Sequence, residues 1–191
     1  MRTARLPLLT ETVKALVARQ LPASLITVIV YSGGFLAGFA STGFPQEFRE
    51  LAVVEPESYW VFLGQNLPAL ALTAAGALTG GLLTLVVLLF NGMLLGFVFA
   101  EAGRNGALEE ALAAVAPHAP LELAAMLLAG TVGFMPASVV IRLALGRTVY
   151  VRRELVDAGV MAVGALVLVT LAALVESSIT PWIINWTVGG G

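Results

Sequence analysis

A histidine and a glutamate stand four residues apart in the stretch PHAPLELAAMLLAG, residues 117–130. Residues four apart share one face of a helix, so His118 and Glu122 can pair directly. Pro120 suits the first turn of a helix, and the positive end of that helix favours a carboxylate at Glu122. The spacing therefore predicts a polar site at the mouth of an otherwise apolar helix.

Further polar side chains interrupt the apolar segments of the chain. Asn66 and Glu176 fall near the ends of two other apolar segments, at the same predicted side as His118 and Glu122. Ionisable groups within a membrane pair, take up a proton or line water, because an isolated charge is costly there. The predicted cluster of Asn66, His118, Glu122 and Glu176 is either a polar knot that sets helix register or a site for a ligand, ion or partner.

The composition indicates which solvent surrounds these groups. The chain has 191 residues, of which 59% are hydrophobic and 12% charged, and its mean hydropathy is +0.94. Soluble domains carry about 25% charged residues, so the apolar segments are predicted to face lipid. The net charge of −2 argues against nucleic acid as a partner. With no cysteine, one histidine and no acids clustered in the sequence, we predict no metal and no cofactor.

The uncharged segments predict an all-α fold, a polytopic membrane helix bundle of about five transmembrane helices plus an N-terminal amphipathic helix. We expect one integral membrane domain, 1–191, with a cytoplasmic interfacial helix over 1–20. The apolar stretch 59–100 would be about 63 Å long as one helix, twice the hydrocarbon core. It must therefore fold back, and Thr79-Gly80-Gly81 is its best turn signal. The spans are predicted at about 21–44, 59–80, 81–101, 119–143 and 158–180.

The placement of charge predicts the orientation of the bundle. Most of the ten basic residues precede the first span or lie between the fourth and fifth spans. The other loops are rich in glutamate, including Glu55 and Glu109. The positive-inside rule then predicts a multi-pass protein of the cell membrane with a cytoplasmic N-terminus and an extracytoplasmic C-terminus.

Small residues predict close contacts between helices. Gly34 and Gly38 stand four apart, as do Gly92 and Gly96, and this spacing lets helix backbones approach each other. Such contacts serve either packing within the bundle or a homo-oligomer interface. Asn91, beside Gly92, is expected to form a hydrogen bond between helices.

Three blocks of this sequence resemble the stage II sporulation protein M family: QNLPALALTAAGALTGGLLTLVVLLFNGMLLG, PHAPLELAAMLLAGTVG and LAALVESSITP. The resemblance covers about residues 60–181, and Ala119 departs from it by replacing a usual glycine. It implies a multi-pass membrane protein that, in spore formers, is an engulfment scaffold holding two peptidoglycan-remodelling partners. Relatives also occur in bacteria and archaea that form no spores. The matching positions are Asn66, Asn91-Gly92, Pro117-His118, Glu122-Leu123, Glu176 and Thr180-Pro181.

Three functions remain open on this basis. The leading hypothesis is a non-enzymatic protein that recruits protein partners in the bilayer or outside it, because no Ser/His, Asp/Asp, HExxH or Walker arrangement is present. The alternative is a transport component whose outer His/Glu cluster handles a proton or small solute. A third reading is a lipid-binding or lipid-modifying protein. A transporter would need a polar path from the outer cluster to the cytoplasm.

Overall fold

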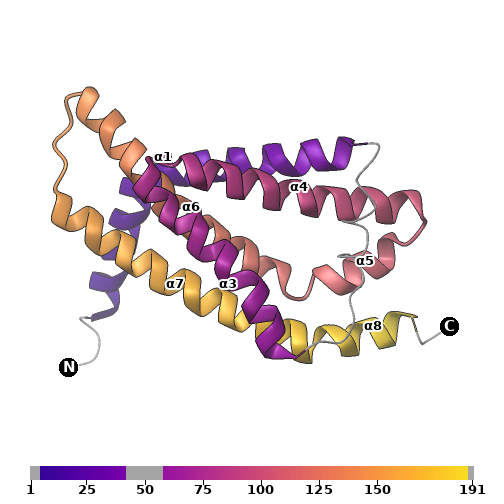
Figure 1. The fold of residues 1–191 in the computed structure, drawn as a ribbon. Coiled ribbons are helices and arrows are strands. Elements are labelled where there is room, and N and C mark those ends of the chain that lie inside the picture. The colour runs from indigo at the N-terminus through magenta and orange to yellow at the C-terminus, as the bar shows by residue number, and fades with distance from the viewer. Residues whose placement is uncertain (1–4, 42–57, 189–191) are drawn as a thin grey trace.

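The computed structural model describes residues 5–41 and 58–188, and all regular elements in those ranges are helices (Figure 1). Five of them are long and apolar enough to cross a membrane, namely Glu11–Ala40, Tyr59–Thr79, Leu82–Arg104, Ala119–Ala144 and Val151–Ser178. The predicted five-helix membrane bundle is therefore confirmed. The elements are α1 (Arg5–Ala40), α3 (Tyr59–Ala75), the 3-10 turn η2 (Gly76–Thr79), α4 (Leu82–Arg104), α5 (Leu108–Val115), α6 (Ala119–Ala144), α7 (Val151–Ser178) and α8 (Thr180–Val188).

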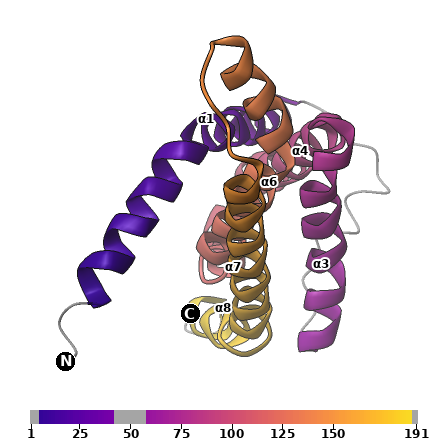
Figure 2. The same cartoon turned by 90° about the vertical axis from the view of Figure 1, so that its left-hand side faces the viewer.

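The first helix joins two segments that the sequence predicted as separate elements. α1 runs without interruption through the expected boundary between an interfacial helix and a span, with Pro22 inside it. Proline removes one backbone N–H and can kink a helix, and membrane helices tolerate it where neighbouring groups satisfy the freed carbonyl. Figure 2 shows the resulting change of direction along α1. Its N-terminal part therefore reaches α7, while its C-terminal part packs along α4.

The turn between α3 and α4 depends on two glycines. Gly80 has φ 64° and Gly81 has φ 98°, a left-handed backbone that glycine adopts without a steric cost. The hydroxyl of Thr84 donates to the carbonyl of Thr73 at 2.8 Å, which ties the two helices together just beyond the turn. A side chain at Gly81 would also press on the ring of Phe134 in α6. The long apolar segment therefore folds back near the Thr79-Gly80-Gly81 signal.

The contact between α1 and α4 is made at backbone distance. A Cβ atom at Gly34 or Gly38 would clash with the backbone of Leu89 or Met93 in α4. Conversely, Gly92 and Gly96 lie directly against the backbone of α1 around Phe35. All four glycines selected from the sequence thus lie in one intramolecular helix pair, where close approach increases dispersion contact between backbones.

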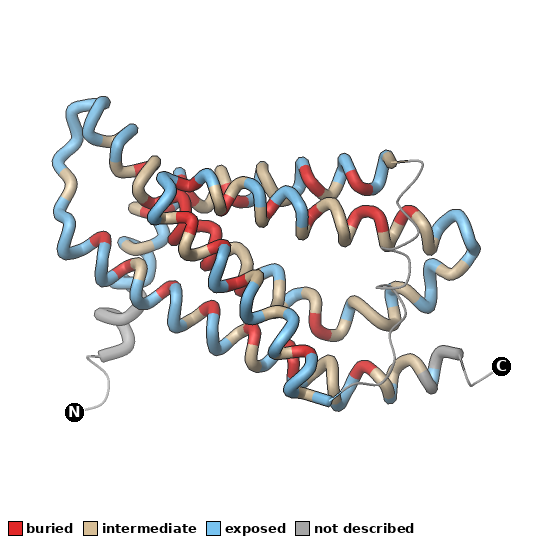
Figure 3. The backbone as a smooth tube through the Cα atoms, viewed as in Figure 1, coloured by how far each residue is buried: buried red, intermediate tan, exposed pale blue. Residues whose placement is uncertain are grey.

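The distribution of burial matches a protein surrounded by lipid. Buried residues gather where α1, α4 and α6 meet, around Ala23, Leu88 and Phe134 (Figure 3). The outward faces of the long helices are nevertheless apolar, with Ile29 69% exposed and Val163 64% exposed. In water such a surface would cost free energy in proportion to its area, whereas a hydrocarbon core removes that cost.

Candidate functional site

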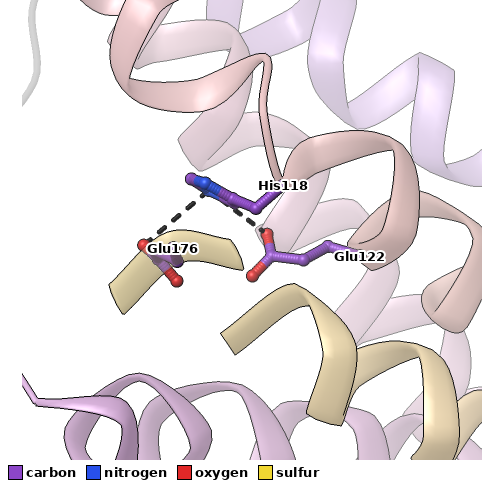
Figure 4. Close-up of side chains that lie close together, drawn as sticks. All are labelled: His118, Glu122 and Glu176. Carbon is purple, nitrogen blue, oxygen red and sulfur yellow. Dashed lines mark ion pairs between the residues drawn. The ribbon is translucent and has the colours of Figure 1, made fainter. Parts of the chain in front are cut away.

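The candidate site lies where α6 begins and α7 ends. His118 is the N-cap of α6, and Glu122 follows in its first turn. Glu176 reaches the same point from the last turns of α7 (Figure 4). The His118 Nε2 atom lies 4.0 Å from Glu122 Oε2 and 3.7 Å from Glu176 Oε1. These three side chains are only 9%, 27% and 14% exposed, respectively, so the fold brings the predicted residues together away from the surface.

Two further helices complete the polar cluster. The Nδ2 atom of Asn66, in α3, donates to Glu122 Oε1 at 2.5 Å. On the other side, His118 Nδ1 lies 3.4 Å from the hydroxyl oxygen of Thr180, at the start of α8. Asn66, His118, Glu122 and Glu176 thus meet from α3, α6 and α7, and sequence reasoning missed only Thr180 as a neighbour of the imidazole. The signal in the sequence that could have identified Thr180 is the Thr180-Pro181 pair, which follows Glu176 closely.

The cluster opens on a cavity of about 340 Å³ whose lining includes Asn66, His118, Glu122 and Asn91. Asn91 donates from Nδ2 to the carbonyl of Val87 in its own helix at 2.8 Å. The described hydrogen bond of Asn91 is therefore intrahelical, where the sequence predicted a bond between helices. Its position makes Asn91 part of the cavity wall opposite α6.

A larger apolar groove adjoins the polar cavity. The groove, of about 540 Å³, lies among α1, α4 and α6 and is lined by residues such as Val28, Phe35 and Leu36. Leu36 is 64% exposed, so the groove is open along the outer face of α1. The groove and the cavity share part of their walls, so an apolar groove and a polar cavity lie side by side, and the two together are called the recess. The shared residues are Tyr31, Leu95, Leu123 and Met126.

The polar end of this recess favours cationic or hydrogen-bond-donating groups. Burial lowers the pKa of the His118 imidazole, which favours its neutral form. No arginine or lysine is among the described residues that line the cavity. One donor atom each from His118, Glu122 and Glu176 lies within 4.8 Å of the others, a spacing that could hold a metal ion. The sequence predicted no metal because these acids are far apart along the chain, and the fold brings them together.

A second ionic cluster occupies the opposite ends of α6 and α7. Arg142 forms two bonds to Glu154, of 3.0 and 2.8 Å, and Arg19 of α1 forms two bonds to Asp157, of 2.9 and 2.8 Å. Gln20 Nε2 donates to both carboxylates, at 2.9 and 3.0 Å. Charge counting in the sequence treated the two arginines only as topology signals. The missed clue is the pair Glu154 and Asp157, which share a helix face in an otherwise basic segment.

The two clusters lie about one hydrocarbon thickness apart. A helix rises about 1.5 Å per residue, so α6 separates Glu122 from Arg142 by about 30 Å. Apolar helices with ionic clusters at both ends are the organisation of a polytopic membrane protein.

The comparisons with known proteins specify the family. The chain belongs to the stage II sporulation protein M family, whose model matches residues 23–181, and the resemblance drawn from the sequence is thereby confirmed. The chain is also similar to an uncharacterized protein of Methanocaldococcus jannaschii, with 29% identity over 170 residues that cover 85% of this chain and 96% of that protein. Among solved structures, none matches the chain significantly.

Proposed function

We propose that this protein is a non-enzymatic membrane component that recruits a partner protein by binding one of its transmembrane helices. The observation that carries the proposal is the recess, in which an apolar groove among α1, α4 and α6 lies directly beside the cavity at His118 and Glu122 and shares wall residues with it. A helix in the bilayer can place apolar side chains in such a groove, as helices do in grooves of soluble proteins. The scaffold role implied by the family in spore formers is one instance of such recruitment.

Charge complementarity specifies the chemistry of the bound helix. The carboxyl group of Glu122 and the imidazole of His118 line the cavity, and no basic residue is among its described lining residues. The carboxyl group of Glu176 lies behind them, 3.7 Å from His118 Nε2. A lysine or arginine in the outer half of the partner helix would be paired there and satisfied by hydrogen bonds. We therefore infer a partner helix that carries a basic side chain in its outer half.

The orientation belongs to the same proposal. We infer that the N-terminus and the ionic cluster of Arg142 and Glu154 face the cytoplasm, and that the recess faces the outer half of the cell membrane. Between the two clusters, α3, α6 and α7 pack through apolar residues that are at most 5% exposed, namely Leu70, Ala125, Ala129, Ala165 and Val169. This layer supports binding more than transport, because a solute path requires polar groups or water.

Photocrosslinking in living cells tests the proposal. A benzophenone amino acid replaces Leu36, which is 64% exposed at the groove, or Leu174, which is 52% exposed on α7 away from the groove. We expect a discrete adduct from position 36 with a protein whose transmembrane helix contains a basic residue in its outer half. The adduct should disappear with Glu122→Gln and with removal of that basic residue.

Matched variants make the result specific. Glu110→Gln removes an equal charge from the exposed first turn of α5 and should leave the adduct unchanged. Adducts with lipid alone, equal protein adducts from positions 36 and 174, or an adduct that persists in Glu122→Gln would each contradict the proposal. An adduct with a second copy of this chain would also contradict it, since a homo-oligomer would then occupy the groove.

A further inference from the structure

The end of α6, the start of α7 and the middle of α1 surround a second cavity that the proposed function does not use. It has a volume of about 350 Å³ and is lined by four arginines: Arg19, Arg142, Arg147 and Arg153. Glu154 also lines it, and Asp157 is bonded to Arg19 directly behind it. Four guanidinium groups against two carboxylates leave an excess of two positive charges at this point.

Two of these arginines are held rigidly in the cavity wall. Arg142 uses Nη1 and Nη2 on Glu154, and Arg19 uses Nε and one Nη on Asp157. A guanidinium has five N–H groups in a fixed plane, so each of these arginines keeps donors beyond its carboxylate. Their side chains are 13% and 31% exposed, respectively. The two guanidinium groups are therefore already oriented, and their remaining N–H groups can donate hydrogen bonds to an anion.

The other two arginines come from the loop between α6 and α7 and from the first turn of α7. Gly146, with φ 73°, ends α6 in a left-handed turn, and the N–H of Arg147 donates to the carbonyl of Arg142 at 2.9 Å. This is a Schellman ending, which sets where the backbone of Arg147 leaves the helix. Arg153 stacks over the Tyr150 ring at 5.1 Å. Within the described residues, neither Arg147 nor Arg153 forms an ion pair with a carboxylate.

Exposed apolar side chains stand within a few residues of the cavity arginines in the sequence. Leu145 is 69% exposed, Val151 68% and Leu155 68%, and all three lie on the loop or the first turns of α7. An anion bound by Arg147 or Arg153 would therefore lie near exposed apolar side chains. A ligand that satisfies both surfaces has a phosphate group and acyl chains.

We propose that this cavity binds the phosphate headgroup of an anionic phospholipid in the leaflet that contacts the inner ends of α6 and α7. The phosphodiester oxygens accept hydrogen bonds from the guanidinium groups, and the acyl chains lie along Leu145, Val151 and Leu155. The excess positive charge favours an anionic headgroup over a zwitterionic one, because basic residues at a membrane surface attract anionic lipids. The site is separate from the recess beside His118, so its test is independent of the proposed partner.

Native mass spectrometry of the full chain in mild detergent tests this site. The protein is titrated with dioleoyl phosphatidylglycerol, with dioleoyl phosphatidylcholine and with soluble glycerol phosphate. We expect phosphatidylglycerol to bind at least tenfold more tightly than phosphatidylcholine, and glycerol phosphate to bind more weakly than the intact anionic lipid. In the double variant Arg147→Gln/Arg153→Gln the preference for phosphatidylglycerol should fall by about tenfold. Both positions are exposed, so this variant should melt within a few degrees of the parent protein.

The control removes the same charge from outside the cavity. Arg152 is exposed and next to Arg153 but does not line the cavity, and Lys14 forms only an exposed pair with Glu11. The double variant Lys14→Gln/Arg152→Gln should keep the lipid preference within about twofold. Equal binding of the two phospholipids, or an equal loss in this control, would overturn the site. Binding of glycerol phosphate as tight as that of the lipid would overturn the assignment to a membrane lipid.

Discussion

Asn66 and Glu122 are joined by a hydrogen bond of 2.5 Å that connects the middle of α3 to the first turn of α6. The amide occupies Oε1 of the carboxylate, while Oε2 faces the imidazole of His118. The two carboxylate oxygens thus have different partners on different helices. Glu122 is therefore the residue through which the polar cluster holds α3 against α6.

This relationship predicts different results for two substitutions of Glu122. Glu122→Gln keeps an acceptor for Asn66, so the melting temperature in detergent should change by only a few degrees. Glu122→Leu leaves a half-buried amide without its acceptor, at a cost of about 1–3 kcal/mol, and should lower melting by roughly 2–10 °C. Thermal unfolding followed by circular dichroism measures both. Glu110→Leu, at an exposed position, is the control, and equal melting of the two Leu variants would contradict the role of Glu122.

Two adjacent glycines in α1 predict opposite effects of the same substitution. A Cβ atom at Gly34 would clash with the backbone of Leu89, whereas a Cβ atom at Gly33 meets nothing within 4 Å. Gly34→Ala should therefore destabilise the bundle by about 1–3 kcal/mol through overpacking. Gly33→Ala should be neutral or stabilise it by up to about 1 kcal/mol, because alanine favours the helix. Melting in detergent measures the difference, and the reverse order would show that α1 and α4 are not packed at backbone distance.

The ionic cluster at the start of α7 predicts a large effect of breaking one buried pair. Asp157→Ala leaves Arg19 without its carboxylate, and Asp157 itself is only 5% exposed. Removing one partner of a buried pair costs about 3–5 kcal/mol, a range that the partial exposure of Arg19 shifts toward its lower end. Glu11→Ala breaks a pair whose side chains are 71% and 68% exposed, and should cost less than about 1 kcal/mol. Denaturant or thermal unfolding of both variants checks this contrast.

The absence of cysteine from the sequence makes the topology directly testable. Single substitutions Glu109→Cys and Arg152→Cys place thiols at exposed positions next to opposite ends of α6. An impermeant maleimide added to intact cells should label position 109, and should label position 152 only after permeabilisation. Labelling of both in intact cells, or the reverse pattern, would contradict the inferred orientation. Glu55, which the sequence also predicts to be outside, lies beyond the described residues.

The fold was largely predictable because its signals are local. Apolar segments longer than a bilayer is thick must turn, and Gly80 and Gly81 mark where the chain does so. The separate N-terminal helix was not distinguishable from an extension of the first span. Pro22 is compatible with either a boundary or a bend, and only the packing of Arg19 and Gln20 against α7 decides between them.

The candidate site was predictable only in part, because some of its contacts join residues that are far apart in the sequence. His118 and Glu122 share a helix face by spacing alone, but Glu176 reaches them through the packing of α6 against α7. The ionic cluster at the start of α7 shows the limit more clearly. The pattern of charges along the sequence gives the sign of Arg19 and Arg142 and the side of the membrane on which they are expected. Their carboxylate partners depend on how each helix is rotated about its axis in the bundle, and the spacing of apolar residues does not determine that rotation.

The bond between Arg19 and Asp157 also constrains how the protein is made. The two residues are 138 positions apart in sequence, so at 5–20 residues per second the ribosome needs roughly 7 to 28 s between them. During that time the first helix has entered the membrane with its arginine and Gln20 still unmatched. The packing of α1 against α4 and α6 can form before the last spanning helix emerges, whereas the ion pair of Arg19 can form only after it. A chain that ends before Asp157 would keep this arginine and Gln20 without the carboxylates that bind them in the complete fold.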